Sequence, residues 1–191
     1  MIISASRRTD IPAFYAQWFI NRIRAGHCTV PNPFNRKQVS HVSLHTGNVD
    51  IIAFWTRSPQ PLIPYLKELD QLGYRYYFQY TVMNNPRLID SNVPSLSSSL
   101  KMFKKLSDLI GSERIIWRYD PVIISNITDI KFHTNTYKHI AETLRNYTQR
   151  SVISILDIYP KLKKRLKALK DKGVEIVDLN KEFDKRFDEL M

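Results

Sequence analysis

The chain has 191 residues, of which 43% are apolar and 12% are aromatic. This composition excludes a disordered or low-complexity chain, and the length favours one folded domain spanning residues 1–191. The formal net charge is +11, which favours nucleic acid, phosphorylated metabolites or an acidic protein as partners. Much of the positive excess lies in residues 161–172, so a plain solvated basic surface is the alternative interpretation.

The single cysteine, Cys28, can form neither an internal disulfide nor, by itself, a zinc or iron–sulfur site. A lone thiol indicates a reducing, cytoplasmic compartment. Residues 1–10 resemble neither a signal peptide nor an anchor, and no stretch approaches the roughly 20 apolar residues of a spanning helix. We therefore expect a cytoplasmic protein with no membrane partner.

The first part of the chain predicts one strand, one helix and an irregular region. Residues 2–5 have the composition of a strand, and residues 13–26 have the periodicity of a helix. The side chains expected to point inward from this helix are Phe14, Trp18 and Ile23. Residues 28–47 contain too many Pro, Asn and Gly for a helix, and they predict a long loop with a small hairpin at residues 39–44.

The rest of the chain alternates short apolar runs with helical patterns. Further strands are expected at residues 49–56, 74–82, 114–119, 151–159 and 174–177. Helices are expected at residues 58–73, 100–110, 130–147, 161–172 and 181–191. The helix over residues 100–110 has Leu100, Phe103, Leu106 and Ile110 as its buried stripe, and the helix over residues 161–172 has Leu162, Leu166 and Leu169.

Strands that are apolar on both faces and separated by helices are typical of parallel strands covered on both sides. The predicted fold class is therefore α/β, with about six βα units. Spacing alone does not distinguish a (β/α) barrel from a doubly wound open sheet. The five glycines form neither GxGxxG nor a P-loop, which argues against the common glycine-rich nucleotide sites.

Polar and aromatic residues follow the predicted strands, at the edge where α/β proteins place their ligand sites. The predicted site residues are Ser6, Arg7, Arg8, Thr9, Asp10, Trp55, Thr56, Arg57, Gln79, Tyr80, Thr81, Arg118, Tyr119, Asp120 and Asp157. Five strand ends contribute to this set. We therefore interpret it as a binding site.

The residue types in this set suit an anionic ligand. The four arginines carry guanidinium groups, which bind phosphate or carboxylate through two parallel hydrogen bonds. Trp55, Tyr80 and Tyr119 are available to stack on a planar group. Asp10 and Asp120 are candidates for acid–base catalysis. In the alternative interpretation, these two aspartates neutralise the arginines and cap helices in a purely structural network.

The sequence predicts no metal site. His41 and His45 lie in the hairpin region, and His133 and His139 lie in a predicted helix, without a matching cluster of acidic ligands. The chain contains no serine-nucleophile elbow, HExxH motif or Cys/His dyad. No complete catalytic motif therefore identifies an enzyme.

Several blocks of the sequence resemble one bacterial family, and they occur in order with compatible gaps. The blocks are SRRTDIPAFYAQWFINRIRAG (6–26), VPNPFN (30–35), IIAFWTRSPQPLI (51–63), YYFQYT (76–81), LIGSERIIWRYDPVI (109–123) and SILDIY (154–159). The family they resemble is the domain of unknown function 1848. The resemblance extends to about Lys170.

This resemblance implies a parallel-strand, barrel-like α/β protein that is incomplete, because six units are two short of a closed eight-stranded barrel. It also implies that longer members end in a cysteine cluster similar to the iron–sulfur motif of radical S-adenosylmethionine enzymes. Cys28 cannot supply the three thiolates of such a cluster, so we expect no cofactor in this chain. The expectation is a truncated chain; completion by another subunit and an open sheet are the alternatives.

Two functional hypotheses follow. The first is the substrate-binding barrel portion of an enzyme family, which recognises an anionic, phosphate-bearing ligand such as a nucleotide or nucleic acid at the carboxyl ends of the strands. The second is a non-catalytic nucleic-acid-binding module that uses the basic surface. An oligomer or a further C-terminal segment is expected to complete the barrel in either case.

Overall fold

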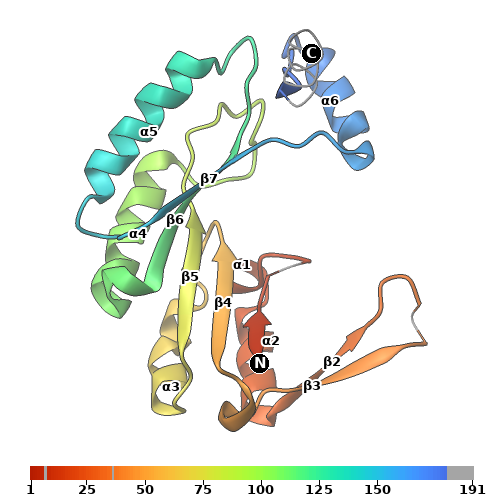
Figure 1. Cartoon of the computed structure of the whole chain (residues 1–191), viewed down its shortest axis with the longest axis vertical. Coiled ribbons are helices and arrows are strands. Elements are labelled where there is room, and N and C mark those ends of the chain that lie inside the picture. The colour runs from red at the N-terminus through yellow and green to blue at the C-terminus, as the bar shows by residue number, and fades with distance from the viewer. Residues whose placement is uncertain (7, 36, 180–191) are drawn as a thin grey trace, which may run out of the picture.

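The computed structural model describes residues 1–6, 8–35 and 37–179. Its centre is a five-stranded parallel sheet (Figure 1). In spatial order the strands are β1 (Ile2–Ser4), β4 (Ile51–Thr56), β5 (Tyr76–Thr81), β6 (Ile115–Val122) and β7 (Ser151–Ile155). The α/β class is confirmed, with five parallel strands in place of about six.

Helices connect these strands, and a two-stranded antiparallel hairpin projects from the sheet. The α-helices are α1 (Ile11–Phe14), α2 (Ala16–Ala25), α3 (Leu66–Gln71), α4 (Leu96–Ile110), α5 (Ile130–Leu144) and α6 (Lys163–Lys170). The hairpin strands are β2 (His27–Pro31) and β3 (Val39–Ser43). Short 3₁₀ helices are η1 (Thr46–Asn48), η2 (Ile63–Tyr65), η3 (Ser112–Arg114) and η4 (Pro160–Leu162).

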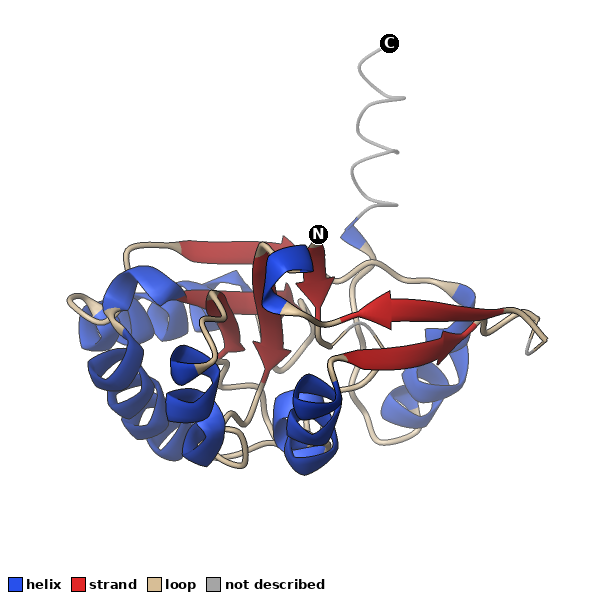
Figure 2. Cartoon of the chain, turned by 90° about the horizontal axis from the view of Figure 1, so that it is seen from below, coloured by secondary structure: helices blue, strands red, loops and turns tan. Residues whose placement is uncertain are grey.

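The strands cross the sheet in chain order, without the reversal that defines a doubly wound sheet. Crossovers that all run in one direction and share one hand place their helices on one face, and Figure 2 shows the helices gathered on one side of the sheet. The prediction that both faces are covered is therefore wrong. The described strands also form no closed sheet, since β1 and β7 are its edges, so a closed barrel is absent from this part of the chain.

We call the side without the connecting helices the open face. From the register of the strands, the residues that point to it are Ile2, Ser4, Ile51, Ala53, Trp55, Tyr77, Gln79, Thr81, Ile116, Arg118, Asp120, Val152 and Ser154. The 40% exposure of Trp55 shows that this face is only partly covered.

The other face of the sheet packs against the helices in a core rich in aromatic rings. Its most buried aromatic side chains are Phe54, Tyr76, Phe78, Tyr80, Trp117 and Tyr119 from the sheet, and Phe103 from α4. The ring of Tyr80 stacks on Phe103 with centroids 5.4 Å apart, and Trp117 stacks on Tyr137 of α5 at 4.6 Å. These contacts bind α4 and α5 to β5 and β6.

The buried stripe predicted for α4 is confirmed. Its four side chains, Leu100, Phe103, Leu106 and Ile110, are all at most 8% exposed. Ser95 caps the helix, since its hydroxyl accepts a hydrogen bond from the backbone N–H of Ser98 at 3.3 Å. A 3.6-residue period was sufficient to identify this element because α4 packs along its whole length on the sheet.

The single helix predicted over residues 13–26 is divided at Tyr15, whose backbone is not helical. The break rotates the following helix relative to the predicted face. Trp18 on the following helix is 47% exposed and Phe14, at the end of α1, is 75% exposed, contrary to the prediction, whereas Ile23 is buried as expected. The residues that α2 buries are Ala16, Phe19, Ile20 and Ile23.

The predictions for the hairpin, for residues 174–177 and for the residues outside the described part have other outcomes. The hairpin is longer than expected, because residues 27–31 also form a strand, which pairs with residues 39–43. Residues 174–177 are not a strand of the sheet, and Ile176 makes only an isolated bridge with Ser125. The predicted helix over residues 181–191 and the predicted site residue Arg7 lie outside the described residues. Within those residues, no helix combines the length and the apolar character needed to cross a membrane.

Candidate functional site

Strand β6 carries charged side chains to the open face. Its side chains alternate, so that Trp117 and Tyr119 point to the helices while Arg118 and Asp120 point to the open face. Beyond Tyr119 the register with β7 shifts. The opposite charges in this apolar strand therefore lie on one side of it, next to each other.

The guanidinium of Arg118 is held by three side chains. Its Nε donates to Asp120 Oδ2 at 2.9 Å, its Nη2 donates to the same oxygen, and its Nη1 donates to Gln79 Oε1 at 2.7 Å. Its central carbon lies 4.3 Å from the centre of the Trp55 ring, a cation–π contact. The side chains of Arg118 and Asp120 are only 12% and 23% exposed, so solvent screens this ion pair weakly.

Asp120 also links β6 to the edge strand. Its second oxygen, Oδ1, accepts a hydrogen bond from the hydroxyl of Ser154 on β7. Both oxygens of the carboxylate are therefore occupied by protein donors. Asp120 and Ser154 lie at the wall of a pocket, described below, whereas Arg118 and Trp55 lie beside it on the open face.

A second ion pair lies at the end of β4. Arg57 Nη1 donates to Asp90 Oδ2 at 2.9 Å, and Asn85 Nδ2 donates to the same oxygen at 3.2 Å. The side chains of Arg57 and Asp90 are 32% and 19% exposed. This pair joins the β4 end to the loop that follows β5.

Asp10 has a structural role at the end of β1. Its Oδ1 accepts the backbone N–H of Ala13 at 3.0 Å and caps α1. Its Oδ2 accepts the Thr56 hydroxyl at 2.9 Å and the backbone N–H of Arg57 at 2.8 Å. Arg118 thus pairs with Asp120 on its own strand, and Asp10 fixes the loops that follow β1 and β4.

The pocket lies between the ends of β6 and β7 and helix α6, with a volume of about 370 Å³. Its polar lining residues are Arg57, Asp90, Asp120, Ser154, Asp157 and Arg165. Its apolar lining residues are Ile89, Pro121, Ile123, Ile155, Leu156, Tyr159, Leu162, Leu166, Leu169 and Ile176. This volume is at the lower end of the range found for small-molecule sites.

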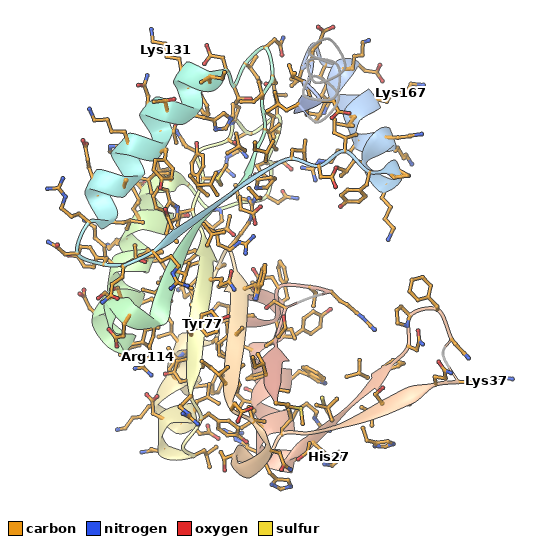
Figure 3. The ribbon with its side chains drawn as sticks, in the orientation of Figure 1. His27, Lys37, Tyr77, Arg114, Lys131 and Lys167 are labelled. Carbon is orange, nitrogen blue, oxygen red and sulfur yellow. The ribbon has the colours of Figure 1, made fainter. Side chains whose placement is uncertain are left out.

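Helix α6 forms one wall of this pocket. The stripe predicted from the sequence faces the pocket: Leu166 and Leu169 lie on α6, Leu162 lies in η4 just before it, and Leu169 is buried. Arg165 lies on the same helix and donates from Nη2 to the carbonyl of Ile89 at 2.7 Å. Lys167 of α6 points outward, away from the sheet (Figure 3).

Two predicted site residues, Tyr80 and Tyr119, lie in the core instead. They are 1% and 2% exposed and point to the helices, so neither can stack on a ligand at the open face. Burial raises the pKa of both phenols, that of Tyr119 to about 12. The Tyr119 hydroxyl lies 2.8 Å from Nδ1 of His133, and Nε2 of that ring lies 2.9 Å from the Ile123 carbonyl. The carbonyl requires N–H at Nε2, so the hydroxyl donates to Nδ1 when the ring is neutral.

The remaining predicted residues are spread around the sheet edge. Ser6 accepts the backbone N–H of Trp55 at 3.3 Å and thereby joins the ends of β1 and β4. Arg8 is exposed and donates to the carbonyl of Pro31 at 3.1 Å, at the hairpin. Thr9 is exposed, and Thr81 is the register partner of Arg118. The structure therefore gathers only part of the predicted set around the pocket.

Sequence reasoning missed Asp90 and Arg165, because neither follows a strand of the predicted pattern. Asp90 lies in the loop after β5, and Arg165 lies in a helix whose charges predict a solvated face. The available signal was the apolar stripe of α6, which required a partner surface. Among the described residues, no group of three or more His, Cys, Asp and Glu side chains could hold a metal ion.

The fold and the pocket define an α/β protein with a small-molecule-sized pocket at the carboxyl edge of an open parallel sheet. The family model described as domain of unknown function (DUF1848) matches residues 2–191, and the chain belongs to this family. The resemblance seen in the sequence is thereby confirmed and extends beyond Lys170. No curated protein and no solved structure matched the chain.

Proposed function

We propose that the pocket between the β6 and β7 ends and α6 binds a small molecule that has an anionic group and an apolar body. The chain would then be the substrate-binding portion of an enzyme family, built on a barrel-like arrangement of strands in chain order. The observation that carries this proposal is the hydrogen-bonding capacity that the pocket arginines still have.

Formal charge does not decide the ligand class, because two arginines and three aspartates line the pocket. Hydrogen-bonding capacity differs between the two kinds of group. A guanidinium has five N–H donors, and in the described part of the chain Arg57 and Arg165 each donate one side-chain hydrogen bond. Asp120, in contrast, already accepts on both oxygens. Unused donors at the pocket favour a ligand group rich in acceptors, such as phosphate or carboxylate.

The apolar wall supports the second half of the proposal. Ten of the residues that line the pocket are apolar or aromatic, and they come from α6, β6, β7 and the flanking loops. A free inorganic anion would leave this surface in contact with water. A ligand with an apolar or planar body buries it, at about 25 cal/mol for each Å² removed from water.

Asp120 is the better of the two predicted acid–base candidates. It lines the pocket, whereas both oxygens of Asp10 bind the loops that follow β1 and β4. A substrate group that displaces the Ser154 hydroxyl from Oδ1 would give Asp120 a proton to accept.

Three probes test the proposed ligand class: phenyl phosphate, inorganic phosphate and phenol. We expect phenyl phosphate to bind more tightly than the other two, as measured by titration calorimetry. Arg165→Gln should weaken phenyl phosphate binding about tenfold, because one charge-assisted hydrogen bond is lost. Equal affinity for phenol and phenyl phosphate would contradict an anionic ligand.

The matched control is Arg145→Gln, which removes an exposed arginine just after α5 and outside the pocket lining. This variant has the same change in net charge. If both variants weaken binding equally, general electrostatic attraction explains the effect and the pocket does not. Circular dichroism and the unfolding midpoint should show that both variants are folded.

A further inference from the structure

The β2–β3 hairpin has an exposed surface that is separate from the pocket. It projects away from the sheet (Figure 1), and most of its residues are exposed. At its tip Phe34 is 98% exposed, and beside the tip Val30 and Val39 are 37% and 46% exposed. An aromatic ring so fully exposed loses the stabilisation that burial would give, unless a partner covers it.

Amide side chains at the tip form hydrogen bonds with the backbone N–H groups of Phe34 and Lys37. Asn32 Oδ1 accepts the backbone N–H of Phe34 at 2.9 Å, and Asn32 Nδ2 donates to Gln38 Oε1 at 2.9 Å. Asn35 Oδ1 accepts the backbone N–H of Lys37 at 3.2 Å. The backbone N–H groups of Phe34 and Lys37 are therefore held by side chains of the tip, so less conformational entropy is lost on binding.

The charge of this region is one-sided. Residues 11–49 contain no aspartate or glutamate, in a chain of net charge +11. Figure 3 shows Lys37 at the hairpin tip, pointing away from the sheet. The other labelled lysines, Lys131 on α5 and Lys167 on α6, point outward from separate elements. An exposed ring beside a cation, without nearby carboxylates in sequence, is complementary to a polyanion that has planar groups.

We infer that the tip of the β2–β3 hairpin binds single-stranded nucleic acid, with Phe34 stacking on a base and Lys37 contacting a phosphate. Single strands offer unpaired base faces for such stacking, in contrast to a duplex. The amides of Asn32, Asn35 and Gln38 can bind base edges but are costly to place in hydrocarbon, which disfavours a membrane as the partner. The hairpin would thus deliver a strand to the protein independently of the pocket.

The test measures binding of fluorescein-labelled oligouridylate and oligothymidylate of about 15 nucleotides, a length that spans one typical single-strand site. We expect the wild-type chain to bind, and Phe34→Ala to bind roughly tenfold more weakly. Phe34→Trp should retain affinity, because indole also stacks. Lys37→Gln should reduce the slope of log affinity against log salt by about 0.7, the value for one phosphate contact on a single strand.

Phe14→Ala is the matched control, because Phe14 is also a highly exposed phenylalanine and lies on α1. It should leave oligonucleotide affinity unchanged. Absence of binding by the wild-type chain, or equal affinity of Phe34→Ala and wild type, would overturn the inference. So would a loss in Phe34→Ala of binding to phosphatidylserine vesicles or of a dimer, if oligonucleotide affinity stayed the same. Phenyl phosphate binding should be unaffected by Phe34→Ala, which separates this inference from the proposed function.

Discussion

The two faces of β6 differ although they share one backbone. On the helix side, Trp117 and Tyr119 are buried, and the Trp117 Nε1–H donates to the carbonyl of Val82 at 3.1 Å. On the open face, Arg118 and Asp120 are part-buried and form an ion pair with Gln79 and Ser154 as further partners. One face is filled by aromatic packing, and the other is held by directional polar contacts.

Because of this difference, we expect the helix side of β6 to determine stability and the open face to take part in ligand binding. Aromatic packing gains free energy from area removed from water, and it has no remaining capacity for a ligand. The polar face costs desolvation to build, and the pocket beside it has two arginines, Arg57 and Arg165, with N–H donors still to offer. We therefore expect substitutions on the helix side to change unfolding, and substitutions around the open face to change ligand binding as well.

The largest effect is expected from Trp117→Ala. The side chain is 2% exposed and stacks on Tyr137, so its removal leaves a cavity between β6 and α5. The free energy of unfolding should fall by about 3–5 kcal/mol. Urea unfolding followed by far-ultraviolet circular dichroism measures this change. A loss under about 1 kcal/mol would show that this face is not the stable side of β6.

A smaller loss of about 2 kcal/mol is expected from Asp120→Asn, because Arg118 would keep its charge at 12% exposure without its carboxylate partner. The exposure of both side chains makes this value lower than for a fully buried pair. Phenyl phosphate binding should change in the same variant, in contrast to Trp117→Ala at temperatures where that variant is folded.

The control for this pair is Glu68→Gln, which breaks an exposed ion pair. Arg24 Nε donates to Glu68 Oε1 at 2.7 Å and Nη2 donates to Oε2 at 2.8 Å. This pair is outside the sheet, and its contact with water should make the loss smaller than for Asp120→Asn. Equal losses would mean that the open face does not shield Arg118 and Asp120 from solvent.

The smallest effect is expected from pH. Burial raises the pKa of Tyr119 from its ordinary value near 10 to about 12. The unfolded chain therefore loses this proton first, so the contribution of Tyr119 is complete below pH 10 and declines as the pH rises from about 10 to 12. By pH 11 the decline should be about 1 kcal/mol.

Tyr119→Phe tests this, because its unfolding free energy should decrease less between pH 9 and about 11 than that of the wild type. Tyr15→Phe, at a half-exposed ring of the helix break, is the matched control. Parallel curves for wild type and Tyr119→Phe would contradict a buried phenol at this position.

Much of the fold was predictable where one element packs along its length on another. The five parallel strands and the buried stripe of α4 were identified from periodicity and apolar runs. The predicted inward orientation of Phe14 and Trp18 was wrong, because the helix is broken at Tyr15 and no proline or glycine at that position marks the break. The sequence also did not predict that one side of the sheet lacks connecting helices. The pattern of residues along a strand does not indicate on which side of the sheet the crossover helices lie.

The candidate site was predictable only at its strand ends. The sequence identified Trp55, Gln79, Arg118 and Asp120, which the structure brings together on the open face. The core positions of Tyr80 and Tyr119 follow from strand alternation, once the face of Arg118 is known. Asp90 and Arg165 reach the pocket from a loop and a late helix, and such long-range placement leaves no local pattern in the sequence.

The position of the hairpin depends on the backbone conformation of Gly26. It ends α2 with φ of 73°, its carbonyl accepts the backbone N–H of Leu44 at 2.8 Å, and a Cβ placed on it would lie 2.6 Å from the His45 ring. Gly26 is therefore the point at which the chain turns from α2 into the hairpin strand β2, which begins at His27. A five-residue strand is roughly 17 Å long, so a tilt of about 10° at Gly26 would move the far end of β2, at Pro31, by roughly 3 Å, and Phe34 beyond it by more. A side chain at Gly26 would therefore be expected to displace His45 or the backbone at the base of the hairpin, and with it the exposed Phe34.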